Sequence, residues 1–238
     1  MSHMSLTKTP ITEKSIIVNT STLKTREEYV CWLDMMGTKS NMSDSFEKST
    51  NFMLRFHSAV FSVVKKRDNV RFYPVMDGVY ITCPNAQSMK TTIKEIMTKL
   101  SIIFVEESSC FHKFIIRGAL AYGAIAHGIS VDDDICDSLA GQDYLNYLLF
   151  GMPIILAHMS ERYAAPYGVY IHESARKVKE FQGRHLLIYD KTTKTEMLQK
   201  LITYFEWCKK YNNYLELEPI KIDQYKQLVT EYYTDIRK

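Results

Sequence analysis

The sequence predicts an α+β fold with a ferredoxin-like split βαβ core, followed by C-terminal helices. Strand-like and helix-like segments alternate in the order β-α-β-β-α-β, which is the order of that core. A Lys-, Glu- and Tyr-rich tail with helical spacing follows them. With 238 residues, of which 46% are hydrophobic and 24% charged, the chain is long and apolar enough to bury one full core.

The first half of the predicted core contains a strand, a helix and a hairpin. Residues 28–34 are mostly apolar, β-branched or aromatic, which is typical of a strand buried on both faces. Over residues 45–66 most apolar positions recur at spacings of three and four, which predicts a helix with one buried face. Residues 70–83 predict two strands around a tight turn at Asp77 and Gly78, because Asp-Gly is a strong hairpin signal.

The second half continues with elements that complete the core and the tail. We expect a helix over residues 87–106, a pair of strands within 111–128 and a helix over 143–163. A strand follows at 168–173, and the tail from 192 to 238 predicts two helices packed on the core or on a partner subunit.

Charge and composition exclude several classes of protein. The formal net charge is only +3 and the basic residues are dispersed, so we expect no nucleic-acid partner. No run approaches the roughly 20 apolar residues of a membrane-spanning helix, and no signal peptide is visible, which predicts a cytoplasmic protein without a membrane partner. The five cysteines show no CxxC pairing, which favours reduced thiols over disulfides or zinc.

Two aspartates are predicted to meet at one end of the sheet. Asp34 ends the first strand, and Asp77 lies at the tip of the hairpin beside that strand. Neighbouring carboxylates repel each other unless a cation lies between them, and Mg²⁺ is typically held by one or two carboxylates together with substrate phosphates. Taken alone, however, Asp34 fits a helix cap and Asp77 fits a turn residue, so the metal site depends on their joint placement.

The segment "MMGTKS" after Asp34 ends a strand and opens a helix. Its free backbone N–H groups and the positive end of the helix dipole favour a polyphosphate.

Four segments within residues 28–176 carry a family resemblance, because they appear in one order at suitable spacing. They are "WLDMMGTKS", "FYPVMDGVYI", "IIRGALAYGAIAHG" and "FGMPIILAHMSERYAAPYGVYIHESAR". Together they resemble the class III nucleotidyl cyclases and, within that group, the pyrimidine cyclases of bacterial Pycsar antiphage defence.

The resemblance implies a two-metal site. Asp34, Asp77 and the backbone carbonyl of Met35 would hold two Mg²⁺ or Mn²⁺ ions. The implied reaction is attack of the ribose 3′-hydroxyl on the α-phosphorus, with pyrophosphate leaving. The residues implied to contact the phosphates are Gly37, Thr38 and Lys39.

The base-reading position departs from that of adenylate cyclases. Those enzymes carry a lysine four residues before the hairpin aspartate, where this chain has Tyr73, and the Pycsar cyclases are similar in having tyrosine there. An aromatic side chain narrows the pocket and can hydrogen-bond a smaller base, so Tyr73 is the predicted pyrimidine contact. The alternative is an aromatic residue that only packs at a strand end.

Other departures remove groups that related enzymes use. The asparagine and arginine of the later helix align with Ile155 and Met159, and a phosphate-binding arginine aligns with Ala124. Either other cations replace these groups, or the site binds nucleotide without turnover. The candidate replacements are Lys39, Arg55 and Arg117.

The resulting expectation is a pyrimidine nucleotide cyclase that takes CTP or UTP. The resemblance implies a homodimer with sites at the subunit interface and a separate effector that detects the cyclic product. We expect a flexible tail with a vector remnant (1–25), a cyclase-like catalytic domain (26–190) and a C-terminal helical extension (191–238). The alternatives are a nucleotide-sensing module of the same fold and a purine cyclase.

Overall fold

The computed structural model describes residues 24–130, 145–211 and 219–234. In this part of the chain, a six-stranded sheet has the order β2-β3-β1-β4-β5, and β6 pairs with β4 in parallel. The other pairings are antiparallel. The strands are β1 (Arg26–Met36), β2 (Arg71–Val75), β3 (Gly78–Cys83), β4 (Ile115–His127), β5 (Leu149–Phe150) and β6 (Val169–Ile171).

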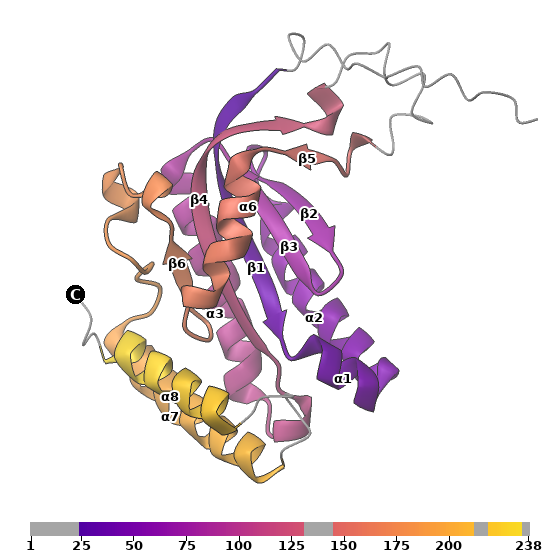
Figure 1. The fold of residues 1–238 in the computed structure, drawn as a ribbon, viewed down its shortest axis with the longest axis vertical. Helices are drawn as coiled ribbons and strands as arrows, with labels where there is room; N and C mark the ends of the chain where they lie inside the picture. Colours follow the sequence, from indigo (N-terminus) through magenta and orange to yellow (C-terminus); the bar gives the residue numbers. More distant parts are fainter. Residues whose placement is uncertain (1–23, 131–144, 212–218, 235–238) are drawn as a thin grey trace, which may run out of the picture.

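Helices lie on both faces of this sheet. Figure 1 shows α6 in front of β1 and β4, with α2 and α3 behind the sheet and the α7–α8 pair at its lower end. The helices are α1 (Thr38–Asp44), α2 (Phe46–Val64), α3 (Ala86–Glu106), α6 (Met152–Ser160), α7 (Lys191–Lys210) and α8 (Pro219–Tyr233). None of the helices in the described ranges is long and apolar enough to span a membrane.

The period-two alternation of β1 separates two hydrophobic clusters. Cys31 and Leu33 point into the main core, where Phe56 of α2 and Ile93 of α3 are also fully buried. Trp32 belongs to a smaller cluster under α6. The even-numbered positions of β1 therefore define the α6 face of the sheet, and Asp34 lies on that face.

The central hairpin differs from its prediction by one residue. Val75 pairs with Gly78, so the two turn residues are Met76 and Asp77, and Gly78 is the first residue of β3. Met76 takes the left-handed conformation, with φ of 49°. Gly78 is needed for space instead, because an added Cβ would lie 2.0 Å from the Trp32 ring.

Replacing Gly78 with alanine should therefore destabilise the fold. The Trp32 ring is 5% exposed and packs against Tyr80 and His158, with ring centroids at 4.3 and 5.5 Å, so it cannot move away cheaply. We expect urea unfolding to show a loss of about 1–3 kcal/mol. In a Trp32→Leu background, Gly78→Ala should lower the free energy of unfolding by much less. An equal loss of unfolding free energy in both backgrounds would contradict the steric explanation.

Two other predicted elements were wrong. Residues 115–127 form one strand, not two, and β4 pairs with β1 from Arg26 to Met36. At Gly118 an added Cβ would lie 2.5 Å from the Trp32 carbonyl oxygen, so this glycine permits close backbone approach between β4 and β1. The helix predicted over 143–163 is interrupted, because Leu149–Phe150 pair with β4 as β5 and Gly151 has a φ of 143°. Its later part is α6, which begins at Met152, and residues 143 and 144 lie outside the described residues.

The remaining order is confirmed. Strand, helix, hairpin, helix and strand follow one another as β1, α2, β2–β3, α3 and β4. The two tail helices, α7 and α8, also form and bury Tyr204, Phe205 and Val229 against the main core. The acidic segment 131–137 and the N-terminal segment 1–23 lie outside the described residues.

Candidate active site

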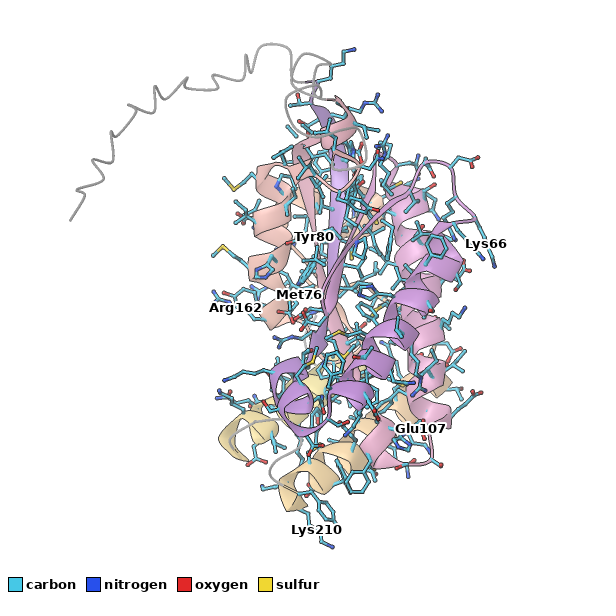
Figure 2. The ribbon with its side chains drawn as sticks, turned by 90° about the vertical axis from the view of Figure 1, so that its right-hand side faces the viewer. Lys66, Met76, Tyr80, Glu107, Arg162 and Lys210 are labelled. Carbon is cyan, nitrogen blue, oxygen red and sulfur yellow. The ribbon has the colours of Figure 1, made fainter. Side chains whose placement is uncertain are left out.

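The structure brings Asp34 and Asp77 to the same end of the sheet. Asp34 lies opposite Gly78 in the β1–β3 register, next to the hairpin turn. The backbone N–H of Met35 donates a hydrogen bond to the carbonyl oxygen of Asp77 at 3.1 Å. Figure 2 shows this region, with Met76 at the turn and Tyr80 farther along β3. The two carboxylates thus sit on adjacent backbone segments that are tied together.

Asp34 occupies an environment that disfavours its charge. Burial, followed by the nearby carboxylates of Glu161 and Asp77, raises the pKa of its carboxyl to about 7. Arg117 and a backbone hydrogen bond from Met35 act in the opposite direction without cancelling the rise. A cation bound between these acids would relieve the repulsion, so the electrostatics fit a metal site.

Arg117 is the guanidinium nearest to this cluster by register. It lies opposite Asp34 across the β1–β4 pairing, on the same face. Its Nε donates to Glu161, and its guanidinium carbon lies 5.6 Å from the ring centroid of Tyr225 on α8. Arg117 was a predicted charge stabiliser, whereas no role was predicted for Glu161, which lies within the fourth quoted segment, or for Tyr225 in the tail.

The segment after Asp34 forms the predicted transition from strand to helix. Gly37 has a left-handed φ of 77° and precedes α1, which begins at Thr38. The Thr38 hydroxyl donates to the carbonyl oxygen of Met35 at 3.2 Å, so it orients the carbonyl that was predicted as a metal ligand. Lys39 is exposed on the first turn of α1.

Arg55, the other predicted charge stabiliser, lies elsewhere. It belongs to α2, on the opposite face of the sheet from Asp34. Its guanidinium pairs with Glu107 at 3.6 Å and contacts the carbonyl oxygen of His112 and the ring of Phe114. The structure does not bring this arginine to the two aspartates.

The donor set fits hard divalent cations that are shared with a substrate. Among the described residues, no group of three or more His, Cys, Asp or Glu side chains could hold a metal ion by itself. Asp34, Asp77 and the Met35 carbonyl supply only oxygen ligands, and a nucleotide's phosphates and water would complete the coordination. This is the arrangement in which Mg²⁺ is usually found.

Comparison with solved structures identifies the architecture. A bacterial light-regulated adenylyl cyclase matches with a TM-score of 0.51 and 11% identity, over 68% of this chain and 47% of that chain. A guanylyl cyclase domain of the fungus Blastocladiella emersonii matches at 0.50 and 13%, over 65% and 84%. The fold is that of the class III cyclases. No protein-family model and no curated protein sequence matches the chain.

A third match extends the comparison to a nucleotide complex. The guanylate cyclase domain from Catenaria anguillulae, whose structure contains GTP, has a TM-score of 0.50 and 15% identity over 67% of this chain and 85% of that chain. Our chain spans about half the length of the bacterial light-regulated cyclase and most of the two guanylyl cyclase domains. At these identities the likeness establishes the cyclase fold alone.

Within this cyclase fold, Tyr73 lies on the same sheet face as Asp34, because it pairs with Tyr80 and Tyr80 pairs with Trp32. Its hydroxyl lies 2.5 Å from Nδ1 of His127. His127 is 2% exposed, so this contact is buried. The link from His127 to the predicted base contact was missed, since it depends on how far β4 extends.

The positions of the missing polar groups are open to solvent. Ile155 and Met159 of α6 are 52% and 57% exposed, and Ala124 is exposed on β4. Met152 is also exposed, at 62%, so an apolar stripe runs along the outer side of α6 at spacings of three and four. The outer side of α6 and Ala124 therefore present a hydrocarbon surface at the positions where the family resemblance implies Asn and Arg.

Proposed function

We propose that this chain is a pyrimidine nucleotide cyclase that converts CTP or UTP into the 3′,5′-cyclic monophosphate and pyrophosphate. One observation supports the proposal more than the others. Asp34 and Asp77 lie together at the end of β1, where burial and neighbouring carboxylates disfavour the charge of Asp34 unless a cation is bound. A protein that used this fold only as a scaffold would gain nothing from crowding a carboxylate whose pKa is raised to about 7.

Asp34, Asp77 and the Met35 carbonyl would hold two Mg²⁺ or Mn²⁺ ions. When bound, such ions lower the pKa of the attacking 3′-hydroxyl and neutralise charge on the triphosphate. Around them, Thr38 orients the Met35 carbonyl, and the backbone after Gly37 offers N–H groups to the phosphates. Gly37, Thr38 and Lys39 are the proposed phosphate contacts.

Arg117 is the proposed replacement for the missing transition-state cation. Its guanidinium is held by Glu161 and stacked near Tyr225, so it is already oriented before a substrate arrives. Preorganised charge of this kind stabilises developing negative charge more effectively than a side chain that must reorient.

Tyr73 supports the pyrimidine assignment. It lies on the sheet face of Asp34, at the position where related adenylate cyclases carry lysine. The phenol is bulky and uncharged, which favours a smaller base over a purine.

The apolar stripe on α6 supports a homodimer. Three large side chains, Met152, Ile155 and Met159, are each more than half exposed along one side of the helix. A second copy covering this stripe would bring a partner surface next to the α6 face, which is the basis for proposing sites at the subunit interface. A cytoplasmic role in antiphage defence, through a separate effector that senses the product, follows from the family resemblance.

One observation favours a second candidate, a nucleotide sensor without turnover. Ile155, Met159 and Ala124 supply no polar group where related enzymes orient the ribose and the phosphates. A purine cyclase is the third reading, since the matched structures are described as adenylyl and guanylyl cyclases.

A single assay separates these functions. The protein is incubated with each of the four ribonucleoside triphosphates and Mn²⁺, and the products are identified by mass. We expect a cyclic pyrimidine monophosphate and pyrophosphate. A cyclic purine product would overturn the base assignment, while nucleotide binding without any product would establish the sensor.

A further inference from the structure

A chain of three buried polar side chains ends at Tyr73. Its Oη lies 2.5 Å from Nδ1 of His127, and Nε2 of His127 lies 3.0 Å from Oε1 of Glu28. The three residues come from β2, β4 and β1 and are 6%, 2% and 4% exposed. Buried polar groups are costly unless they are hydrogen-bonded, and in this Glu28–His127–Tyr73 network each side chain has a partner that holds it in place.

We take Glu28 as ionised and the imidazole of His127 as neutral, and the direction of the hydrogen bonds follows from these two states. An ionised Glu28 only accepts, so Nε2 of His127 carries a proton and donates it to Glu28. A neutral imidazole has one donor and one acceptor, which leaves Nδ1 as the acceptor. The Tyr73 hydroxyl must then donate its proton to His127.

Arg71, two residues before Tyr73 on the same strand face, supports this direction. Burial raises the pKa of Tyr73, and a side-chain hydrogen bond from Arg71 opposes the rise. Because arginine only donates, Arg71 uses a lone pair of the phenol oxygen. A proton on Nδ1 of His127 would place a second donor against that oxygen and leave the phenol proton unused.

We propose that Glu28 and His127 are positioning residues that make Tyr73 a hydrogen-bond acceptor toward the nucleobase, so that the site selects cytosine over uracil. Cytosine carries an exocyclic amine, a donor, at the position where uracil carries a carbonyl oxygen. With its proton committed to His127, Tyr73 can accept from the amine but has nothing to donate to the carbonyl. The inference rests on the proposed function in taking Tyr73 as the residue that contacts the base.

The test compares kcat/KM for all four triphosphates. Since a mismatched hydrogen bond in a closed site is costly, we expect CTP to exceed UTP by about 10- to 100-fold. The proposed function is tested by the kcat/KM of CTP and UTP relative to that of ATP and GTP. This inference is tested by the kcat/KM of the triphosphates whose base carries an amine, CTP and ATP, relative to that of UTP and GTP, whose bases carry a carbonyl oxygen there. If purines were the substrates, the proposed function would fail, and ATP exceeding GTP would still support the network. Equal kcat/KM for CTP and UTP and for ATP and GTP, or a preference for UTP over CTP, would overturn the inference.

Variants separate this role from a structural one. Tyr73→Phe should bring the CTP-to-UTP ratio to within about threefold of one, because no hydroxyl remains to discriminate. Glu28→Leu should also lower the ratio, since the imidazole loses the group that fixes its tautomer, whereas Glu28→Gln, which can still accept from Nε2, should retain it. Tyr80→Phe, on the neighbouring strand and the same face, is the matched control and should keep the wild-type ratio. An unchanged ratio in Tyr73→Phe would overturn the proposal.

Two measurements on the wild type need no turnover. The ¹⁵N chemical shifts of His127 should show a protonated Nε2 and an unprotonated Nδ1, and the reverse assignment would overturn the network. Calorimetry with 3′-deoxy-CTP and 3′-deoxy-UTP, which lack the attacking hydroxyl, should show tighter binding of the cytidine compound. Equal affinities, or binding of neither, would count against the proposal even if no reaction were detected.

Discussion

Replacing Asp77 with asparagine should lower cyclase turnover on the order of 1000-fold, because it removes one of two carboxylates proposed to hold both metal ions. The change is nearly isosteric and leaves the backbone carbonyl of Asp77, which accepts from Met35, in place. The hairpin and its register should therefore survive, and the loss should appear in kcat rather than in the fraction of folded protein. Steady-state rates with CTP or UTP and Mn²⁺ measure it.

Two controls make the result interpretable. Asp223→Asn alters a surface carboxylate that pairs with Lys209 on the neighbouring helix, and it should leave turnover within about twofold of wild type. Mn²⁺ binding in the presence of a 3′-deoxy nucleotide should weaken in Asp77→Asn and stay unchanged in Asp223→Asn. If Asp77→Asn turned over at the wild-type rate, the paired-metal explanation would be wrong whatever the fold.

The meeting of Asp34 and Asp77 could be predicted because it depends on strand order alone. Once residues 28–34 are a strand and residues 70–83 a hairpin, the split βαβ order places the end of the first beside the tip of the second. The structure shows the same neighbourhood through the Asp34–Gly78 register.

The error in the hairpin turn has a physical origin. The glycine after Asp77 was interpreted as a turn residue, but Gly78 is needed to make room for the Trp32 ring. A local sequence window contains the glycine but not the cross-strand side chain that requires it. Long-range packing therefore overrode a strong local signal, and the turn moved to Met76 and Asp77.

The partners of the site residues could not be predicted for a related reason. Glu161 reaches Arg117 only because α6 crosses the sheet. Tyr225 reaches Arg117 only because α8 docks at the lower end of the sheet. Likewise, Glu28 and His127 meet across β1 and β4 far from each other in the sequence. Each contact depends on the docking of a whole element, which no motif of a few residues encodes.

Asp34→Asn should make the metal-free protein more stable at neutral and alkaline pH while abolishing turnover. Burial first, then Glu161 and Asp77, raise the pKa of Asp34 from its ordinary 3.8 to about 7. The folded state thus binds this proton more tightly than the unfolded chain does. Protonation of Asp34 therefore contributes fully to the free energy of unfolding below about pH 4, and this contribution is lost as the pH rises through about 7.

The size of the effect follows from the same shift. Each pH unit between the two pKa values corresponds to about 1.4 kcal/mol, which sets a ceiling of about 4 kcal/mol, and structural relaxation should reduce it to roughly 1–3 kcal/mol. Urea unfolding in EDTA at pH 5 and pH 8 measures the difference. We expect Asp34→Asn to exceed wild type at pH 8 by that amount and to approach it at pH 5, whereas Asp68→Asn, at an exposed turn, should match wild type at both. Divalent cations should stabilise the wild type more than Asp34→Asn at pH 8, since they need the ionised carboxylate. Equal stabilities in EDTA at both pH values would mean that Asp34 carries no electrostatic strain for a metal to relieve.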